Sequence, residues 1–264
     1  MKKVYIWAVS HRPLAILAAA GVLCGIYGGL FYLLDSPFWL VALGMVICLL
    51  LAGVTPALCI NKLILPATKA LNEQCDPYPL LEVTGELLQK KLAPSLRQLV
   101  LMDHGAALAN LGQRQDYYDL LKNIHIDQYA GTLPSVKLVY YCNLAGVCTE
   151  LGKYVEADLC TEKVRMFFAD IKNAKQRAQL QTPVTLCEAD ACYRKKDYDG
   201  ALNLLHPIKA EHWHAAVDRA MAMAKNYLAV GQKEYAREGL QFAVDHGNRL
   251  CSVQEARKLL EENL

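Results

Sequence analysis

The chain has 264 residues, of which 54% are hydrophobic, and a formal net charge of +2. It has no basic stripe with interleaved aromatic residues, which argues against a strongly basic nucleic-acid-binding domain. Charge is unevenly distributed: residues 13–34 and 37–60 contain no charged side chain, whereas the rest of the chain carries all of it. This asymmetry predicts at least two structural units in two different environments.

The two uncharged runs each exceed twenty residues, and about 20 apolar residues are needed for a helix to cross the hydrocarbon layer. A cleaved signal peptide is the alternative for the first run. Its apolar core is too long for that, and a second apolar run follows almost immediately. We therefore predict a short tail at 1–12 and two transmembrane helices at 13–34 and 37–60.

Basic residues predict the orientation of these helices, because Lys and Arg are retained on the cytoplasmic side. Basic residues precede the first predicted helix and follow the second, and the short connection around Asp35 contains no Lys or Arg. The flanking basic residues are Lys2, Lys3, Arg12, Lys62 and Lys69. We expect a two-pass protein of the cell membrane, with a tight external turn and with both termini and the helical domain in the cytoplasm.

Small residues recur every fourth position in both runs, which places each set along one helix face and allows close helix approach. The sets are Gly21, Gly25 and Gly29 in the first run and Gly44, Cys48 and Ala52 in the second. We expect these two faces to pack together within one chain; homodimerisation through one of them is the alternative. Neither run contains an ionisable group of the kind that transport pathways need, which favours an anchor.

Residues 61–264 are rich in Leu, Ala, Lys and Glu at helical spacing, and this predicts an all-α domain. Four windows repeat one pattern, in which two positions twelve residues apart hold small side chains. The pairs are Gly105 and Tyr117, Ala145 and Ala157, Ala189 and Ala201, and Ala224 and Ala236. Between them, the turn that should end the first helix carries Gly112, Gly152, Lys196 and Gly231. Two residues depart from this pattern: Tyr117 is large where the pattern has a small residue, and Lys196 stands where the other three turns have glycine.

This order of residues resembles the tetratricopeptide repeat family. The resemblance covers about four units over residues 98–248, with starts about 40, 44 and 35 residues apart against a family period of 34. It implies an α-solenoid of antiparallel helix pairs. We expect residues 61–97 to form a linker and an N-terminal capping helix, and residues 249–264 to form a C-terminal capping helix. The extra length between units predicts extended second helices.

The resemblance also implies a concave groove lined by the first helix of each pair. The groove residues that we predict are Met102, Asn110, Cys142, Glu150, Leu186, Asp190, Tyr193, Arg194, Asp218, Met221 and Lys225, with Leu99, Val139 and Thr149 beside them. Their mixed charges do not resemble the Lys- and Asn-rich carboxylate clamp of the family's chaperone-binding members. A partly apolar groove suits an amphipathic helix or an extended segment of a protein partner.

No pattern indicates an enzyme, a cofactor or a metal site. The histidines of His212-Trp213-His214 lie on different sides of a helix, and Cys187 and Cys192 are too far apart for a zinc knuckle. Asp103 and His104 are adjacent, but His104 occupies a packing position in the first repeat. We expect the ten cysteines to act as small buried hydrophobic residues in a reducing cytoplasm.

The function that we predict is a membrane-tethered scaffold that recruits a protein or peptide partner and binds no nucleic acid. Two alternatives remain: a self-assembling structural component of the membrane that forms homo-oligomers, and a sensor or enzyme with an unrecognised site.

Overall fold

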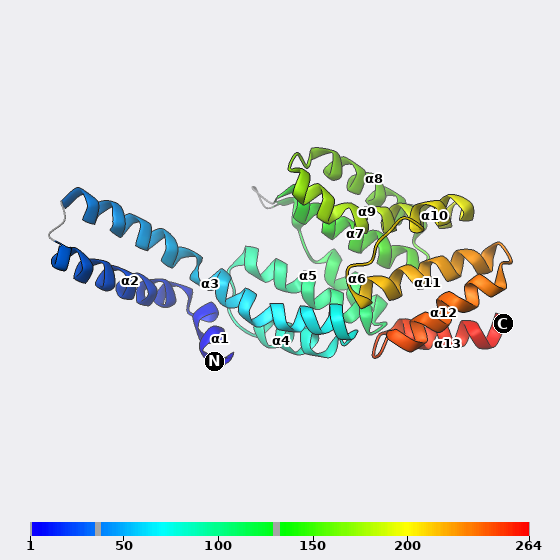
Figure 1. Ribbon diagram of the computed structural model, residues 1–264, viewed down its shortest axis with the longest axis horizontal. Helices are drawn as coiled ribbons and strands as arrows, with labels where there is room; N and C mark the ends of the chain where they lie inside the picture. The colour runs from blue at the N-terminus through cyan, green and yellow to red at the C-terminus, as the bar shows by residue number, and fades with distance from the viewer. Residues whose placement is uncertain (1, 35–37, 129–132, 264) are drawn as a thin grey trace.

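The computed structural model describes residues 2–34, 38–128 and 133–263. These residues form thirteen α-helices and one 3-10 turn (Ile126–Gln128), with no strand among them, and consecutive helices pack as pairs (Figure 1). The predicted all-α class is confirmed. The tight turn expected at residues 35–37 lies outside the described residues.

The N-terminal part comprises α1 (Lys2–Ser10), α2 (Arg12–Leu34) and α3 (Phe38–Gln74). Both α2 and α3 are long and apolar enough to cross a membrane, with mean hydropathies of 1.4 over residues 12–29 and 2.4 over an 18-residue window within residues 43–74. They lie side by side and extend away from the helical domain as a hairpin (Figure 1).

The glycine face of α2 does not pack as predicted. Cys48 and Ala52 of α3 are buried in the hairpin, and the ring of Tyr27 covers Gly44. By contrast, a side chain added at Gly21, Gly25 or Gly29 would meet no atom within 4 Å. The α2 face that meets α3 therefore uses Ala20 and Tyr27, and the three glycines point outward from the hairpin.

Helix α3 differs most from the sequence-based expectation. Residues 61–74, which we predicted as part of a linker, continue the same helix without interruption through Pro66. Apolar residues on one face of this extension are buried in the domain core, including Leu63, Ile64 and Leu71, and packing of this face outweighs the proline's local cost. The helix ends where Cys75 adopts a left-handed φ of 53°. The expected capping helix follows as α4 (Tyr78–Leu88).

Four helix pairs and a final helix occupy the region predicted as repeats and C-terminal cap. They are α5 (Pro94–Asn110) with α6 (Arg114–Lys122), α7 (Pro134–Glu150) with α8 (Tyr154–Asp170), α9 (Ala174–Arg194) with α10 (Tyr198–Leu205), α11 (Trp213–Ala229) with α12 (Lys233–His246), and α13 (Cys251–Asn263). The extra length between the second and third pairs lies mainly in the first helix α9, which has 21 residues; the second helix α8, with 17 residues, is also longer than α6, α10 and α12.

The two departures from the repeat pattern have local explanations. Lys196 adopts a φ of 62° at the position where Gly112, Gly152 and Gly231 have φ values of 77°, 71° and 78°. The third turn therefore has the same backbone geometry without a glycine. At the other departure, the ring of Tyr117 fills the space left by the missing side chain of Gly105.

The helix pairs curve back until the last pair meets the first helices of the chain. Helix α11 packs against α3, and one hydrophobic core joins Leu71 and Leu80 to Val217 and Leu240. At the rim of this contact, Asn248 Nδ2 donates to the Gln74 carbonyl at 2.7 Å, and Arg249 pairs with Asp76 at 3.2 Å. The inner face is thus closed at one side by α3, in place of the open groove that we expected.

Candidate partner-binding site

Two cavities lie along the inner helices, at opposite ends. The first, which we call the α3 cleft, has a volume of about 680 Å³ and is lined by residues 60–68 of α3 and by the first halves of α5, α7 and α9. The second, which we call the polar pocket, has a volume of about 380 Å³ and is lined by the last turns of α7, α9 and α11, with contributions from α6, α8, α10 and α13.

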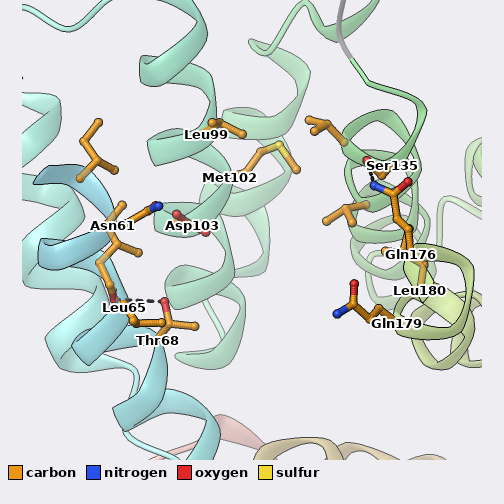
Figure 2. Close-up of a pocket in the computed structure, with 14 residues that line it drawn as sticks. Asn61, Leu65, Thr68, Leu99, Met102, Asp103, Ser135, Gln176, Gln179 and Leu180 are labelled. Atoms are coloured by element: carbon orange, nitrogen blue, oxygen red, sulfur yellow. Dashed lines mark hydrogen bonds between the residues drawn. The ribbon is translucent and has the colours of Figure 1, made fainter. Parts of the chain in front are cut away.

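The α3 cleft is predominantly apolar. Figure 2 shows Leu65 on α3 with Leu99 and Met102 on α5, facing Leu180 across the cleft. Leu65 is 66% exposed and Leu99 is 45% exposed, so two large apolar side chains face solvent in the cleft. Such exposed apolar surface in a concave site is typical of a partner-binding site.

Six polar side chains also line the cleft: Asn61, Thr68, Asp103, Ser135, Gln176 and Gln179. On the wall opposite α3, Gln176 Nε2 donates to Ser135 Oγ at 3.0 Å and links α9 to α7 (Figure 2). On the α5 wall, burial raises the pKa of Asp103 to about 6, and within the described part of the chain this carboxyl group has no ion-pair partner. A buried carboxyl group of this kind is available to a donor or a cation.

His104, next to Asp103, takes no part in the cleft. Its Nδ1 lies 2.8 Å from Thr84 Oγ1, and the Thr84 hydroxyl donates to the Leu80 carbonyl at 2.6 Å. The hydroxyl therefore accepts a hydrogen bond from Nδ1, and burial lowers the pKa of His104. Asp103 and His104 do not form an acid–base pair, because the histidine is committed to packing between α4 and α5.

The polar pocket is held together by ion pairs between elements that are distant in sequence. Arg114 pairs with Glu150 at 2.8 Å and with Glu255 at 3.4 Å, and Lys225 pairs with Glu255 at 2.8 Å. These contacts connect α6, α7, α11 and α13. Both cations that line the pocket are therefore already neutralised by carboxylates.

Two acceptors in the polar pocket lack partners among the described residues. Burial raises the pKa of Asp190 to about 6, and no ion pair or hydrogen bond to its carboxyl group is found there. Asn226 is only 3% exposed; its Nδ2 donates to the Ala222 carbonyl at 2.8 Å, and its Oδ1 has no partner. Buried polar atoms are nearly always satisfied, so the unpaired Asn226 Oδ1 indicates a ligand or an ordered water molecule.

The predicted groove residues separate into three groups. Met102, Leu99 and Val139 line the α3 cleft. A second group lines the polar pocket: Thr149, Glu150, Asp190, Tyr193 and Lys225. The remaining six are used in packing or in internal hydrogen bonds: Asn110, Cys142, Leu186, Arg194, Asp218 and Met221.

Among the predicted groove residues that are used inside the fold, Arg194 has the most internal contacts. Its side chain is only 2% exposed; it pairs with Asp158 at 2.7 Å and donates to Thr149 at 2.8 Å and to Thr161 at 3.1 Å. Asn110 Oδ1 lies 2.7 Å from His214 Nε2 and bridges α5 to α11, while Met221 is buried in the core. These contacts are structural.

Sequence reasoning missed the residues that the closed fold brings to the two cavities. On α3 they are Asn61, Ile64, Leu65 and Thr68; in the polar pocket they include Arg114, Tyr154, Asn226 and Glu255. The helical spacing of apolar residues from Leu63 to Leu71 could have indicated the continuation of α3. Nothing in the repeat pattern indicates that the last helix approaches the first pair.

No group of three or more His, Cys, Asp or Glu side chains within the described ranges is placed to hold a metal ion. His212 occupies the N-cap position of α11 without a side-chain capping hydrogen bond, His214 contacts Asn110, and the ring of Trp213 stacks on His246 with centroids 4.5 Å apart. All ten cysteines are free thiols; six are buried and four are half-buried.

Comparison with protein-family models, with curated proteins and with solved structures finds no match to this chain.

Proposed function

We propose that this chain is a membrane-tethered scaffold, a two-pass protein whose cytoplasmic, tetratricopeptide-like helical domain recruits a protein partner through the α3 cleft. The observation that carries the proposal is the continuity of α3, which is a single helix of 37 residues from the apolar hairpin into the wall of the cleft. A continuous helix fixes the cleft at a constant distance from the membrane, and tethering raises the effective concentration of a partner on the same surface.

Contacts at the N-terminus support the two-pass arrangement. The Lys2 ammonium group pairs with Glu82 at 3.2 Å and with Glu86 at 3.0 Å, so α1 is held against α4. The base of α2 and the helical domain therefore lie on the same side of the hairpin, as a two-pass topology requires. Trp7 is 46% exposed on α1, shortly before the first apolar run, and aromatic side chains favour the membrane interface.

The partner that suits the α3 cleft is an amphipathic helix of a membrane-associated protein. The α3 wall of the cleft begins at Ile60, where the uncharged run ends, so an occupant approaches along the membrane surface. Leu65 and Leu99 offer apolar contacts, and Asp103 offers a carboxylate to a basic residue on the same helix. This is the helix-in-groove mode of recognition.

Photo-crosslinking in intact cells tests this proposal. A photoreactive amino acid at Leu99 should give one heterologous crosslink, and Leu65→Glu should abolish it by placing a charge in the apolar wall. The matched controls are a photoreactive residue at Val155, which is 79% exposed on α8, and Val155→Glu. Equal crosslinking from position 155, or a Leu99 crosslink that survives Leu65→Glu, would overturn the assignment of the cleft.

Self-assembly through the membrane hairpin is the second candidate, and the outward position of Gly21, Gly25 and Gly29 favours it. Small residues on an exposed helix face allow a second helix to approach closely. Gly25→Ile should reduce the oligomer population measured in mild detergent. An unchanged size distribution would exclude this face as the contact.

A further inference from the structure

The polar pocket lies at the end of the inner helices opposite the α3 cleft, and the two share no lining residue. Its charges do not balance. Glu150, Asp190 and Glu255 supply three carboxylates, whereas Arg114 and Lys225 supply two cations, and both cations are paired with Glu150 or Glu255. Asp190 forms no ion pair in the described part of the chain: the two cations that act on it electrostatically, Arg194 and Lys225, are paired with Asp158 and Glu255.

Asn226 supplies a second acceptor, and its orientation is determined by its neighbour. The Ala222 carbonyl, 2.8 Å away, can only accept, so the nitrogen of the Asn226 amide must face it. The amide oxygen is then left without a partner, on a residue that belongs to the pocket lining and is 3% exposed. The pocket thus offers two acceptors and needs donors.

The remaining walls suit an alkyl chain with a cationic end. Tyr154 and Tyr193 belong to the lining and are 52% and 37% exposed, and the half-buried Leu259 adds apolar surface. Aromatic faces attract cations, and methylene groups pack on apolar surface while the charged end reaches polar groups. An anionic ligand would instead meet Glu150, Asp190 and Glu255.

We propose that the polar pocket binds the ammonium or guanidinium group of a lysine or arginine side chain on a protein partner, with Asp190 and the Asn226 amide oxygen as acceptors. The site is separate from the α3 cleft. Its test uses isolated ligands, so failure of either proposal leaves the other unaffected.

Calorimetry with the full-length protein in lipid nanodiscs tests the site. The probes are the blocked peptide acetyl-Gly-Gly-Lys-Gly-Gly-amide and the same peptide with an ε-acetylated lysine, which keeps the shape and removes the charge. The unmodified peptide should bind, the acetylated one should not, and Asp190→Asn should weaken binding by roughly 10- to 100-fold, the loss of one charge-assisted hydrogen bond. The control variant Glu162→Gln removes an exposed carboxylate of α8 and should change nothing.

Three results would overturn the proposal: no binding of the lysine peptide to the wild-type protein at millimolar concentration, equal binding of the acetylated peptide, or equal binding to Asp190→Asn. The diamine putrescine separates the two sources of an ammonium group, and tighter binding of putrescine than of the peptide would overturn the assignment to a protein side chain. Thermal unfolding of Asp190→Asn, measured alongside, establishes that the variant is folded.

Discussion

The ring of Tyr117 on α6 lies against the backbone of Gly105 on α5, so close that a Cβ added to Gly105 would be 2.6 Å from Tyr117 Cε2. In the next pair, Ala145 and Ala157 occupy the same two positions and are both buried. In the first helix pair, a glycine and a tyrosine therefore stand where the second pair has two alanines. The large ring is accommodated because the glycine has no side chain.

This contact predicts that, in a double-mutant cycle, the effect of Gly105→Ala on stability changes sign when Tyr117 is also replaced by alanine. Gly105→Ala alone should destabilise the protein by about 1 to 3 kcal/mol, because the added methyl group collides with the ring. With Tyr117→Ala present, the same change should stabilise by about 0.5 to 1 kcal/mol, because alanine is the better helix former. Thermal unfolding of the four proteins in detergent measures the cycle, and additive effects would contradict direct coupling.

Lys196 is predicted to be a strained position that glycine would relieve. Its φ of 62° lies in the left-handed region, which disfavours residues with a Cβ. Lys196→Gly should raise stability by about 0.5 to 1 kcal/mol. The neighbouring Lys195 has an ordinary φ of −84°, so Lys195→Gly should not stabilise. A gain in melting temperature for both variants, or for neither, would argue against backbone strain.

Arg194 should matter for stability far more than a surface arginine does. Removing its buried guanidinium group by Arg194→Ala leaves the Thr161 hydroxyl without this donor and breaks the link between α9, α8 and α7, at a cost of about 2 to 4 kcal/mol. The control is Arg165→Ala, which removes an exposed pair with Glu188 and should cost at most about 1 kcal/mol. Equal losses in thermal unfolding would show that burial of Arg194 is unimportant.

The raised pKa of Asp103 leads us to predict that the stability of the protein depends on pH. Burial raises the pKa of its carboxyl group to about 6, above the unfolded value of 3.8, so the folded state binds the proton more tightly. The folded protein therefore loses stability as pH rises from about 4 to about 6, by roughly 1 to 3 kcal/mol. Asp103→Asn should be more stable than the wild type at pH 7.5 and equal to it near pH 4. A difference that does not vary with pH would contradict this.

The sequence predicted the helix pairs well because the pairs are local. The small residues at Ala145 and Ala157, and the glycines that end the first helices, act within about twenty residues of one another. The continuation of α3 was missed because Pro66 and Pro77 indicated a break, and the burial that outweighs Pro66 comes partly from α11, which is distant in sequence.

The cavities were predicted only in part for the same reason. The repeat pattern places Asp190, Tyr193 and Lys225 on one inner face, but the pocket around them is completed by Arg114 of α6 and Glu255 of α13. A hydrogen bond joins Asn110 to His214, 104 positions apart, and so links α5 to α11. Pairwise repeat alignment contains no information on that contact.

The depth of three exposed positions tests directly whether α3 extends from the membrane into the cleft. A fluorescent amino acid would replace Leu50, Leu65 or Tyr235 in turn, which are 69%, 66% and 58% exposed, in nanodiscs that contain lipids with quenchers along the acyl chain. Leu65 lies five residues past Ile60, or about 7 Å along a helix. We predict strong quenching at position 50, weak quenching at 65 and none at 235. Quenching that is equal at all three positions, or absent at position 50, would contradict the membrane-anchored cleft.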